Sequence, residues 1–540
     1  MLRRRFLNLL VNGVFFAAFG IGSRRAQAGS PYRFRHGVAS GDPLADRVII
    51  WTRISGANGE SVRVDWQIGS DVRMRSVLHT GQVVTDGRRD YTVKVDVKNL
   101  PAGTQLYYRF IINGVTSPIG VTRTSPTGDV SVARLAVLSC ANYPSGFFHA
   151  YREIADRNDI DAVIHLGDYL YEYGLGGYAT ENAEKLDRVP DPLHELVSLK
   201  DYRLRHAQYK TDSDLQSMHA SHPVIAVWDD HEIVNDSWRD GSPDHDENEG
   251  LWEERLDAAI QAYFEWMPIR GKARGSRTKI YREFRFGELL SLIMLDTRLH
   301  GRDQQPQLTQ EMQSDEINSV LADPKRRMLG QQQENWLRKT LRKGQETTWQ
   351  LIGQQVLFSP IRSPDLEPLL DPDGPSMIPP KVLDHNIALS KNNPPLLLDT
   401  WDGYAAARED LLTDLKDLVT NPVIISGDLH TSIAGNLHRH GENFPVAVEF
   451  MTTSVTSPGF AEYLPERHPG AVRDATLELN ANLRYMETDR RGWLCMTLTS
   501  SECTGEWHLI DDVKSREYTS TVDRRLAVAA GRVSDGLYEA

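Results

Sequence analysis

At 540 residues the chain is longer than one ordinary domain requires, so we expect one large domain and a smaller partner. Apolar residues make up 40% and charged residues 25% of the sequence, a balance that excludes a disordered chain and a membrane-embedded one. The formal net charge of -13 argues against a nucleic-acid scaffold, because a polyanion would be repelled. Composition therefore favours a small-molecule substrate.

Residues 1–28 read as an export signal, with a basic head, an apolar middle and the small-residue end AQA. The stretch RRRFL fits the twin-arginine pattern, and Arg24 and Arg25 disfavour the ordinary secretory route. We expect the twin-arginine export machinery as a partner and a periplasmic or secreted mature chain; a plain secretory signal or a retained anchor is the alternative. Removing this segment deletes five Arg and no acid, so the charge becomes about -18. No second apolar run of about 18 residues follows, so we expect no transmembrane anchor in the mature chain.

Residues 33–125 predict a small N-terminal all-β sandwich domain. Apolar and polar positions alternate in the stretches VIIWTRI, SVRVDWQIG, YTVKVDV and LYYRFIING. Turn signals such as NG, DG and AG lie between these stretches, as is typical of antiparallel strands. The domain boundary is expected within residues 125–133.

From residue 134 the pattern changes to strands alternating with helices, which predicts an α/β domain over residues 134–515 and a C-terminal tail over 516–540. The strand RLAVLSC precedes the helix FFHAYREIADR and the strand DAVIHLGD. Later apolar strands occur in PVIAVWDDH, LLSLIMLDTR, TWQLIGQQV and NPVIISGDLH. Residues 359–400, rich in Pro and Asp, are expected to form a long inserted loop that shapes access.

Five of these strands end in polar residues that can bind ligands: SCAN, GDYLYE, DDHE, LDTR and GDLH. Because the carboxyl ends of strands in α/β sheets gather at one crevice, we expect the five segments to meet in one site. Asp428 and His430 alternate with Leu429, so both side chains can point the same way. Each segment by itself could equally be a solvated turn. The occurrence of all five at strand ends favours one shared ligand-binding site.

The segment WDDHEIVND places many acids directly after an apolar strand. Buried like charges cannot stay ionised together without cations between them, so metal ions are the natural counter-charge. Oxygen ligands suit Mg, Mn, Ca or trivalent iron, whereas the sequence has no HExxH or paired CxxC of a zinc site. It also has no Walker-type phosphate loop and no GxSxG nucleophile elbow.

Seven motifs in order resemble the PhoD-like alkaline phosphatase family: SCAN, HLGDYLYEYG, VWDDHEIVND, LDTR, LGQQQENWL, WDGYAAAR and GDLHTS. They follow a β-rich leader that contains FRHGVASGDPLADRVIIWTRI, and the resemblance spans about residues 33–500. It implies a two-layered β-sandwich metallophosphatase core flanked by helices. It also implies twin-arginine export and hydrolysis of small phosphate-ester substrates.

The resemblance further implies a ferric ion (Fe3+) accompanied by one or two calcium ions (Ca2+). Asp168 matches the carboxylate shared between ions, and His430 would be a ligand or support one. The full set of expected metal ligands is Cys140, Asp168, Tyr171, Asp230, Asn235, Asp428 and His430. Cys140 and Tyr171 would face the iron, and the choice between Asp230 and Asn235 stays open; a buried inert thiol is the alternative for Cys140.

His231 and Arg298 match positions that would contact the phosphate. His231 would protonate or stabilise the leaving oxygen, or only orient a metal ligand; Arg298 would bind phosphoryl oxygens, or only hold its loop by a salt bridge. The implied function is an exported metal-dependent hydrolase of phosphomonoesters and phosphodiesters, in which metal hydroxide attacks phosphorus. A phospholipase D-like phosphodiesterase acting on phospholipids is the alternative, and a non-catalytic phosphate-binding surface module is the alternative of another class.

Three cysteines occur in the chain. Cys495 and Cys503 are eight positions apart, so we expect that they can pair across a hairpin, which leaves Cys140 unpaired.

Overall fold

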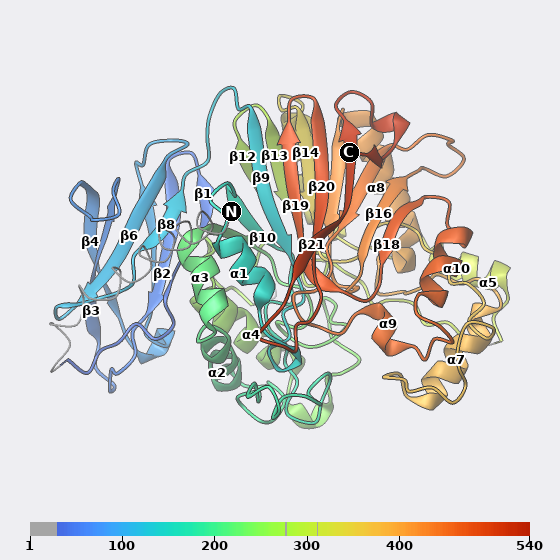
Figure 1. The fold of residues 1–540 in the computed structure, drawn as a ribbon, viewed down its shortest axis with the longest axis horizontal. Helices are drawn as coiled ribbons and strands as arrows, with labels where there is room; N and C mark the ends of the chain where they lie inside the picture. The colour runs from blue at the N-terminus through green and yellow to red at the C-terminus, as the bar shows by residue number, and fades with distance from the viewer. Residues whose placement is uncertain (1–29, 276–277, 310) are drawn as a thin grey trace, which may run out of the picture.

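A computed structural model describes residues 30–275, 278–309 and 311–540. The expected export signal, residues 1–28, lies outside the described residues. Two large β-sheets pack face to face in the centre of the molecule, with helices on their outer faces and a smaller β-domain at one end (Figure 1). The predicted fold class, an α/β two-layered sandwich with an N-terminal all-β domain, is confirmed.

The first central sheet has ten strands. In spatial order they are β22 (Tyr538–Glu539), β21 (Ser520–Ala529), β20 (Glu502–Ile510), β19 (Arg491–Thr499), β9 (Val132–Leu138), β10 (Ala162–His165), β11 (Pro223–Ala226), β1 (Val38–Leu44), β2 (Arg47–Arg53) and β5 (Thr92–Lys98). The strands β9, β10 and β11 are parallel neighbours, and both faces of β10 and β11 are buried. This burial explains why they appear in the sequence as short continuous apolar runs.

The second central sheet has seven strands, and a third sheet belongs to the N-terminal domain. The second contains β12 (Arg282–Phe286), β13 (Leu290–Met294), β14 (Trp349–Gly353), β15 (Pro422–Ser426), β17 (Ala447–Met451), β16 (Ser432–Leu437) and β18 (Leu483–Glu487). The third contains β4 (Val77–Thr85), β3 (Val62–Gly69), β6 (Gln105–Ile112), β7 (Val115–Thr116) and β8 (Gly120–Arg123).

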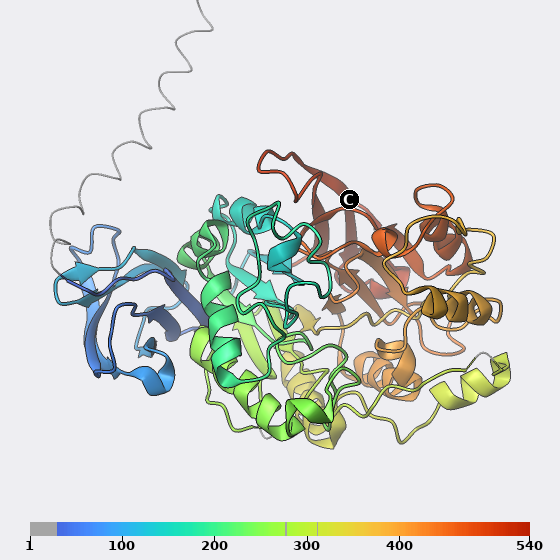
Figure 2. The same ribbon diagram turned by 90° about the horizontal axis from the view of Figure 1, so that it is seen from below.

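Ten α-helices lie in the described residues. They are α1 (His149–Ala155), α2 (Leu199–Tyr209), α3 (Ser213–Ser221), α4 (Trp252–Trp266), α5 (Ser314–Leu321), α6 (Gly330–Gly344), α7 (Pro380–Ser390), α8 (Ala405–Leu418), α9 (Phe460–Tyr463) and α10 (Ala471–Leu479). Figure 2 shows the N-terminal strands at one end of the long axis and α5 and α7 at the other. None of these helices has the length and apolar character needed to cross a membrane.

The alternation of side chains in the seven-stranded sheet separates two cores. Leu292, Leu351 and Val423 belong to the large core between the two central sheets. Their chain neighbours Ile293 and Ile352 belong to a second core, which includes residues of α6 and α8. Because successive side chains of a strand point to opposite faces, an uninterrupted apolar strand fills both cores.

The N-terminal domain is joined to the catalytic core through a shared sheet. The strands β1, β2 and β5 form one layer of the expected sandwich, and their apolar side chains pack on those of the third sheet. The same layer continues into the catalytic core, because β1 pairs in parallel with β11. An added Cβ at Gly41 would lie 2.5 Å from the carbonyl oxygen of Val224, so this close approach requires glycine.

The expected C-terminal tail, residues 516–540, is instead part of the ten-stranded sheet. β21 pairs antiparallel with β20 from Glu502 to Ile510. Exposed residues make up its first six positions, and only Leu526 to Val528 are buried. The strand is polar because it lies near the sheet edge, which is why its pattern did not indicate a strand.

The expected disulfide between Cys495 and Cys503 is wrong, since all three cysteines are free and buried. β19 and β20 pair so that Cys495 lies opposite Glu506 and Cys503 lies opposite Leu498. The two cysteines are therefore three register positions apart and point to opposite faces of the sheet. A disulfide needs Cα atoms within about 7 Å and converging side chains.

Candidate metal centre

The site lies where the carboxyl ends of strands from both central sheets meet. Cys140, Asp168 and Asp230 follow β9, β10 and β11 of the ten-stranded sheet. Arg298 and Asp428 follow β13 and β15 of the seven-stranded sheet. The two edges face each other because an isolated bridge joins Ser139 to Ser454 and the Thr452 hydroxyl donates to the Val137 carbonyl oxygen (3.2 Å).

Sharp turns present several of these side chains to the site. Cys140, Asp168, Asp428 and His430 all have left-handed backbone, with φ of 61°, 53°, 72° and 56°. Such conformations cost energy in residues other than glycine and cluster at functional sites. The preceding Gly167 has φ of 120°, and an added Cβ there would lie 2.3 Å from the Cβ of Asp229, so the turn also requires glycine.

One end of the site, which we call the neutral end, consists of Cys140, Tyr171 and His430. One ligand atom each of Cys140, Asp168 and His430 lie within 4.8 Å of one another. The Tyr171 hydroxyl donates to Asp168 Oδ2 (3.0 Å) and lies 3.1 Å from His430 Nε2. It also accepts a hydrogen bond from the Ser457 hydroxyl (2.7 Å).

The three side chains of the neutral end carry no charge in the absence of a cation. Burial, together with Asp168, raises the pKa of the Cys140 thiol and of the Tyr171 phenol well above their usual values. Burial lowers the pKa of His430 to about 3. His430 Nδ1 lies 2.9 Å from the Pro458 carbonyl oxygen, which can only accept, so Nδ1 carries the proton and the Nε2 lone pair faces the site.

The other end, which we call the charged end, consists of five aspartates around one arginine. Ligand atoms of Asp168, Asp229, Asp230 and Asp428 lie within 4.8 Å of one another, as do those of Asp230, Asp236 and Asp399. Asp168 therefore lies between the two ends and takes part in one ligand group of each. The aspartates of the charged end are Asp229, Asp230, Asp236, Asp399 and Asp428, and the arginine is Arg298.

Arg298 is fully buried and holds the charged end together. Its guanidinium contacts Asp229, donates to Asp399 (2.6 Å) and Asp428 (3.3 Å), and lies 3.6 Å from Asp230. Burial alone would lower the pKa of this guanidinium, but the aspartates raise it well above its usual value. The arginine expected to contact phosphate is thus surrounded by carboxylates.

The carboxylates outnumber the cations available to them. Burial raises the pKa of Asp229 to about 7 and that of Asp236 to about 8, although Arg298 opposes both shifts. Burial raises the pKa of Asp168 and Asp428 well above the usual value. Asp168 Oδ1 is buried and has no hydrogen-bond partner. A buried acceptor without a partner is a position that a cation would satisfy.

His231 is oriented toward the centre by Glu172. Its Nδ1 lies 2.8 Å from Glu172 Oε2, and Glu172 is fully buried. Burial alone would lower the pKa of His231, but Glu172, Asp230 and Asp168 raise it well above its usual value. A ring nitrogen of His231 lies within 4.8 Å of ligand oxygens of Asp168 and Asp230.

Comparison with known proteins agrees with this geometry. The family model described as PhoD-like phosphatase matches residues 135–507, and that of the PhoD-like phosphatase N-terminal domain matches residues 21–126. The chain belongs to the PhoD-like phosphatase family. It is a phosphoric ester hydrolase, and the resemblance found through the seven motifs is confirmed.

Two similar proteins cover most of the chain. Alkaline phosphatase D of Bacillus subtilis (strain 168) is 32% identical over 497 residues, which are 89% of this chain and 78% of that protein. The solved structure of PhoD superimposes with a TM-score of 0.81 at 30% identity, covering 94% of this chain and 92% of that one. The likeness therefore includes both the catalytic core and the N-terminal domain of this PhoD-like phosphatase.

The structure gathers all the residues singled out from the sequence except Asn235. Its backbone N–H donates to Glu172 (2.7 Å), but its side-chain amide donates to Asp244 (3.0 Å), on a partly exposed segment. Asp230, in contrast, belongs to three of the close ligand groups. Between these two candidates, the position of Asp230 fits a ligand better.

Sequence analysis did not select Asp229, Asp236, Asp399 or Arg302 as site residues. Asp399 accepts hydrogen bonds from Arg298 and contacts Arg302, so the segment expected only to shape access also contributes to the site. An available signal was the apolar run LLL directly before Asp399 and the WDGY motif. Asp236 was noted only as part of an acidic run, and its left-handed φ of 55° is visible only in the structure.

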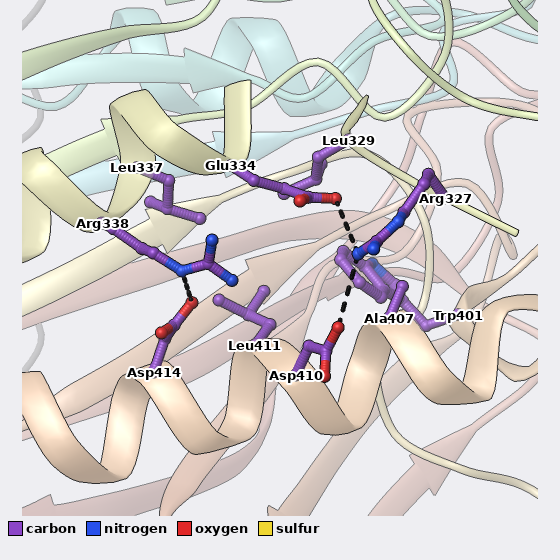
Figure 3. Close-up of a pocket in the computed structure, with 10 residues that line it drawn as sticks. All are labelled: Arg327, Leu329, Glu334, Leu337, Arg338, Trp401, Ala407, Asp410, Leu411 and Asp414. Carbon is purple, nitrogen blue, oxygen red and sulfur yellow. Dashed lines mark hydrogen bonds and ion pairs between the residues drawn. The ribbon is translucent and has the colours of Figure 1, made fainter. Parts of the chain in front are cut away.

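The cavity between α6 and α8 is separate from this site (Figure 3). Its volume is about 20 Å³, room for about one water molecule. Ion pairs join Arg327 to Glu334 (3.5 Å) and Arg338 to Asp414 (2.7 Å) along its walls (Figure 3). Since none of its lining residues belongs to the ligand groups, we assign it no part in phosphate chemistry.

Proposed function

We propose that the protein is an exported metal-dependent phosphatase that hydrolyses phosphomonoesters and phosphodiesters. The observation that carries this proposal is the pair of ends that share Asp168, because each end offers a different ligand set around one carboxylate. A thiol, a phenol and an imidazole meet on one side, and carboxylates meet on the other. A structural core would gain nothing from burying so many acids.

The residues fit the proposed metals. Cys140, Tyr171 and His430 would hold Fe3+ together with Asp168, since a highly charged ion can stabilise the thiolate and phenolate that burial disfavours. Asp230 and Asp428 would hold Ca2+, which prefers oxygen ligands. Ions bound there would supply the positive charge that activates a water molecule and neutralises phosphoryl oxygens.

His231 would serve the leaving group. Glu172 holds its Nδ1 and favours the protonated imidazole, so the other nitrogen would be free to donate toward an oxygen that leaves phosphorus. The ring of His231 stacks on that of Tyr171, with centroids 4.1 Å apart. This stacking, together with Glu172, restricts the direction of the proton donor.

Arg298 would position the aspartates. Its guanidinium is 0% exposed and shared among four carboxylates, so its donors are already used. A contact with phosphate would require those aspartates to turn to bound cations first. We therefore propose that Arg298 positions the aspartates, and the Arg298→Lys variant tests whether it also contacts phosphate.

The function is tested by substrates and by colour. Purified protein would be assayed with a phosphomonoester, a phosphodiester and a phospholipid, and its metals would be quantified. We expect hydrolysis of the first two, bound iron, and a visible tyrosinate-to-iron band that Tyr171→Phe abolishes or shifts and the exposed control Tyr538→Phe leaves unchanged. A preference for phospholipid would favour the phospholipase D-like reading; full metal content without any turnover would favour the binding module. Active protein without iron would refute the site proposed here.

Export is tested separately. The twin-arginine assignment rests on residues 1–28 alone, so those residues would be fused to a reporter that is exported only when folded. Export should require Arg3 and Arg4 together, and replacing both by Lys should abolish it. Export that persists would indicate the ordinary secretory route.

A further inference from the structure

Two tyrosines meet hydroxyl to hydroxyl beside the neutral end. The hydroxyls of Tyr178 and Tyr463 are in direct contact, and their rings are nearly parallel, with centroids 6.3 Å apart. Each hydroxyl lies 3.5 Å from Nδ1 of His430. That Nδ1 is already satisfied by the Pro458 carbonyl oxygen at 2.9 Å, so His430 does not need the two phenols to hold it.

The pair occupies the boundary between the centre and solvent. Both tyrosines are half-buried, whereas His430 and Tyr171 behind them are buried. The Tyr178 ring also stacks on Tyr171, with centroids 6.0 Å apart, and Tyr171 contacts Asp168. A group attached to phosphorus that extends toward this side would therefore meet the two phenols.

The two phenols come from segments far apart in the chain. Tyr178 follows the glycines of the stretch GLGG, and the Thr180 hydroxyl closes this turn by accepting from the N–H of Gly176 (2.9 Å). Tyr463 ends α9, and its carbonyl oxygen accepts from the Ser376 hydroxyl of the inserted segment (2.9 Å). Tyr463 also packs against a small apolar cluster shared with α7, and Figure 1 shows α7, α9 and α10 together at one end of the molecule.

We propose that Tyr178 and Tyr463 form a specificity-determining pair that limits the size of the ester group admitted beside the neutral end. Small esters fit with the hydroxyl contact intact; a bulky ester group must part the phenols and replace their mutual hydrogen bond by its own contacts. The inserted segment thereby acts on substrate choice through Tyr463. This inference rests on the proposed phosphatase function.

The first test compares a small and a bulky substrate, glycerol phosphate and bis(p-nitrophenyl) phosphate. Tyr463→Ala should raise the ratio of kcat/KM for the bulky over the small ester about tenfold, mainly through KM of the bulky one. Tyr178→Phe and Tyr463→Phe should each raise it about two- to threefold. Because both act by breaking one contact, the double Phe variant should change the ratio no more than either single variant.

A matched control is Tyr173→Phe, which lies on the same loop as Tyr178 and packs at an angle against its ring, with centroids 5.6 Å apart. It should leave the ratio unchanged. If Tyr178 and Tyr463 only support the fold, their variants will change both substrates by the same factor, and that result overturns the proposal. Additive effects of the two Phe variants would also overturn the role of their contact.

A binding measurement separates this proposal from the proposed function. Inorganic phosphate and phenylphosphonate, whose phosphorus–carbon bond is not an ester, would be titrated into the metal-loaded protein by calorimetry. Tyr463→Ala should tighten phenylphosphonate relative to phosphate by about tenfold. If the wild type binds both ligands but hydrolyses no ester, the proposed function is refuted, and the ratio of the two affinities still tests the role of Tyr178 and Tyr463. If Tyr463→Ala leaves this ratio unchanged, the role of the tyrosine pair is refuted even in an active enzyme.

Discussion

The neutral end and the charged end of the centre are both deeply buried, but they differ in how the cost of burying ionisable side chains is offset. At the neutral end, Cys140 and Tyr171 keep their protons and His430 is unprotonated, so no counter-charge is required. At the charged end the carboxylates are held by one buried guanidinium. Without cations, the ligands of the neutral end are therefore uncharged, whereas the carboxylates of the charged end are stabilised by Arg298.

Each arrangement has its own cost. The neutral end must release protons before its sulfur and phenol oxygen can bind a cation. The charged end offers oxygens at once, but it depends on Arg298 whenever cations are lacking. Asp168 connects the two, since it hydrogen-bonds Tyr171 and lies among the aspartates. Variants should therefore separate losses of activity from losses of stability.

The largest effect is expected for Asp168→Asn, which removes the carboxylate shared by both ends. We expect kcat/KM to fall by about a thousandfold or more and the metal content to fall with it, because neither end keeps its full ligand set. Steady-state kinetics and metal analysis measure the two quantities. The exposed Asp365→Asn is the control, and a loss below about tenfold would show that Asp168 does not link the ends.

Arg298→Met should affect the charged end alone, and its first effect should be on stability. Removing one partner of a buried ionic network costs about 3–5 kcal/mol in free energy of unfolding. Denaturant unfolding of the metal-free protein would measure the loss. Arg298→Lys keeps the positive charge but loses the planar set of guanidinium donors, so it should recover only part of the lost free energy of unfolding.

The Arg298→Lys variant also decides the role of the arginine. If kcat/KM of stable, metal-loaded Arg298→Lys falls far more than its stability, the guanidinium contacts phosphate. If activity follows metal content and stability, Arg298 positions the aspartates, as we propose.

Glu172→Gln should have an intermediate effect that stays local to His231. The amide keeps the shape, and its oxygen can accept from Nδ1, which lies 2.8 Å from the present carboxylate, but it lacks the negative charge that favours the imidazolium. Loss of such a supporting partner costs about 10- to 100-fold in activity or metal affinity. Kinetics with metal analysis would tell these apart, and the spectrum of the neutral end should not change. A spectrum altered as much as by Tyr171→Phe would contradict the separation of the two ends.

Lys210→Met should have the smallest effect, and it tests whether burial without counter-charge keeps a group neutral outside the centre as it does at the neutral end. Lys210 Nζ donates to the Tyr169 hydroxyl (2.8 Å), and no carboxylate of the described residues forms an ion pair with it. Burial lowers the pKa of Lys210 well below its usual value. Between this lowered folded-state pKa and the unfolded pKa of about 10.4, the unfolded chain therefore binds a proton that the folded chain lacks.

Between the folded and the unfolded pKa of Lys210, the free energy of unfolding therefore rises as the pH increases. Lys210→Met should remove up to about 1.4 kcal/mol per pH unit of this slope between about pH 8 and 10. Unfolding at several pH values, compared with the exposed Lys185→Met, measures it. An unchanged slope would mean that Lys210 stays protonated in the folded protein.

Sequence patterns were sufficient for the strands that matter most. The runs RLAVLSC, DAVIHLGD and NPVIISGDLH are strands buried on both faces, so their apolar character and their polar ends were both visible. The same patterns failed at β21, where edge position removes the apolar signal, and at Cys495 and Cys503, where strand register decides which face each thiol occupies.

By itself, the sequence determined the family and the chemical types at the centre, because a strand followed by ligand residues is a local pattern. Only the tertiary structure decided which residues meet. It brought Asp399 to Arg298 across 101 positions and Tyr178 to Tyr463 across 285. It also gave Arg298 four aspartates in place of an open donor face. Local sequence encodes backbone direction and side-chain chemistry, whereas contacts between distant segments depend on how the two sheets pack.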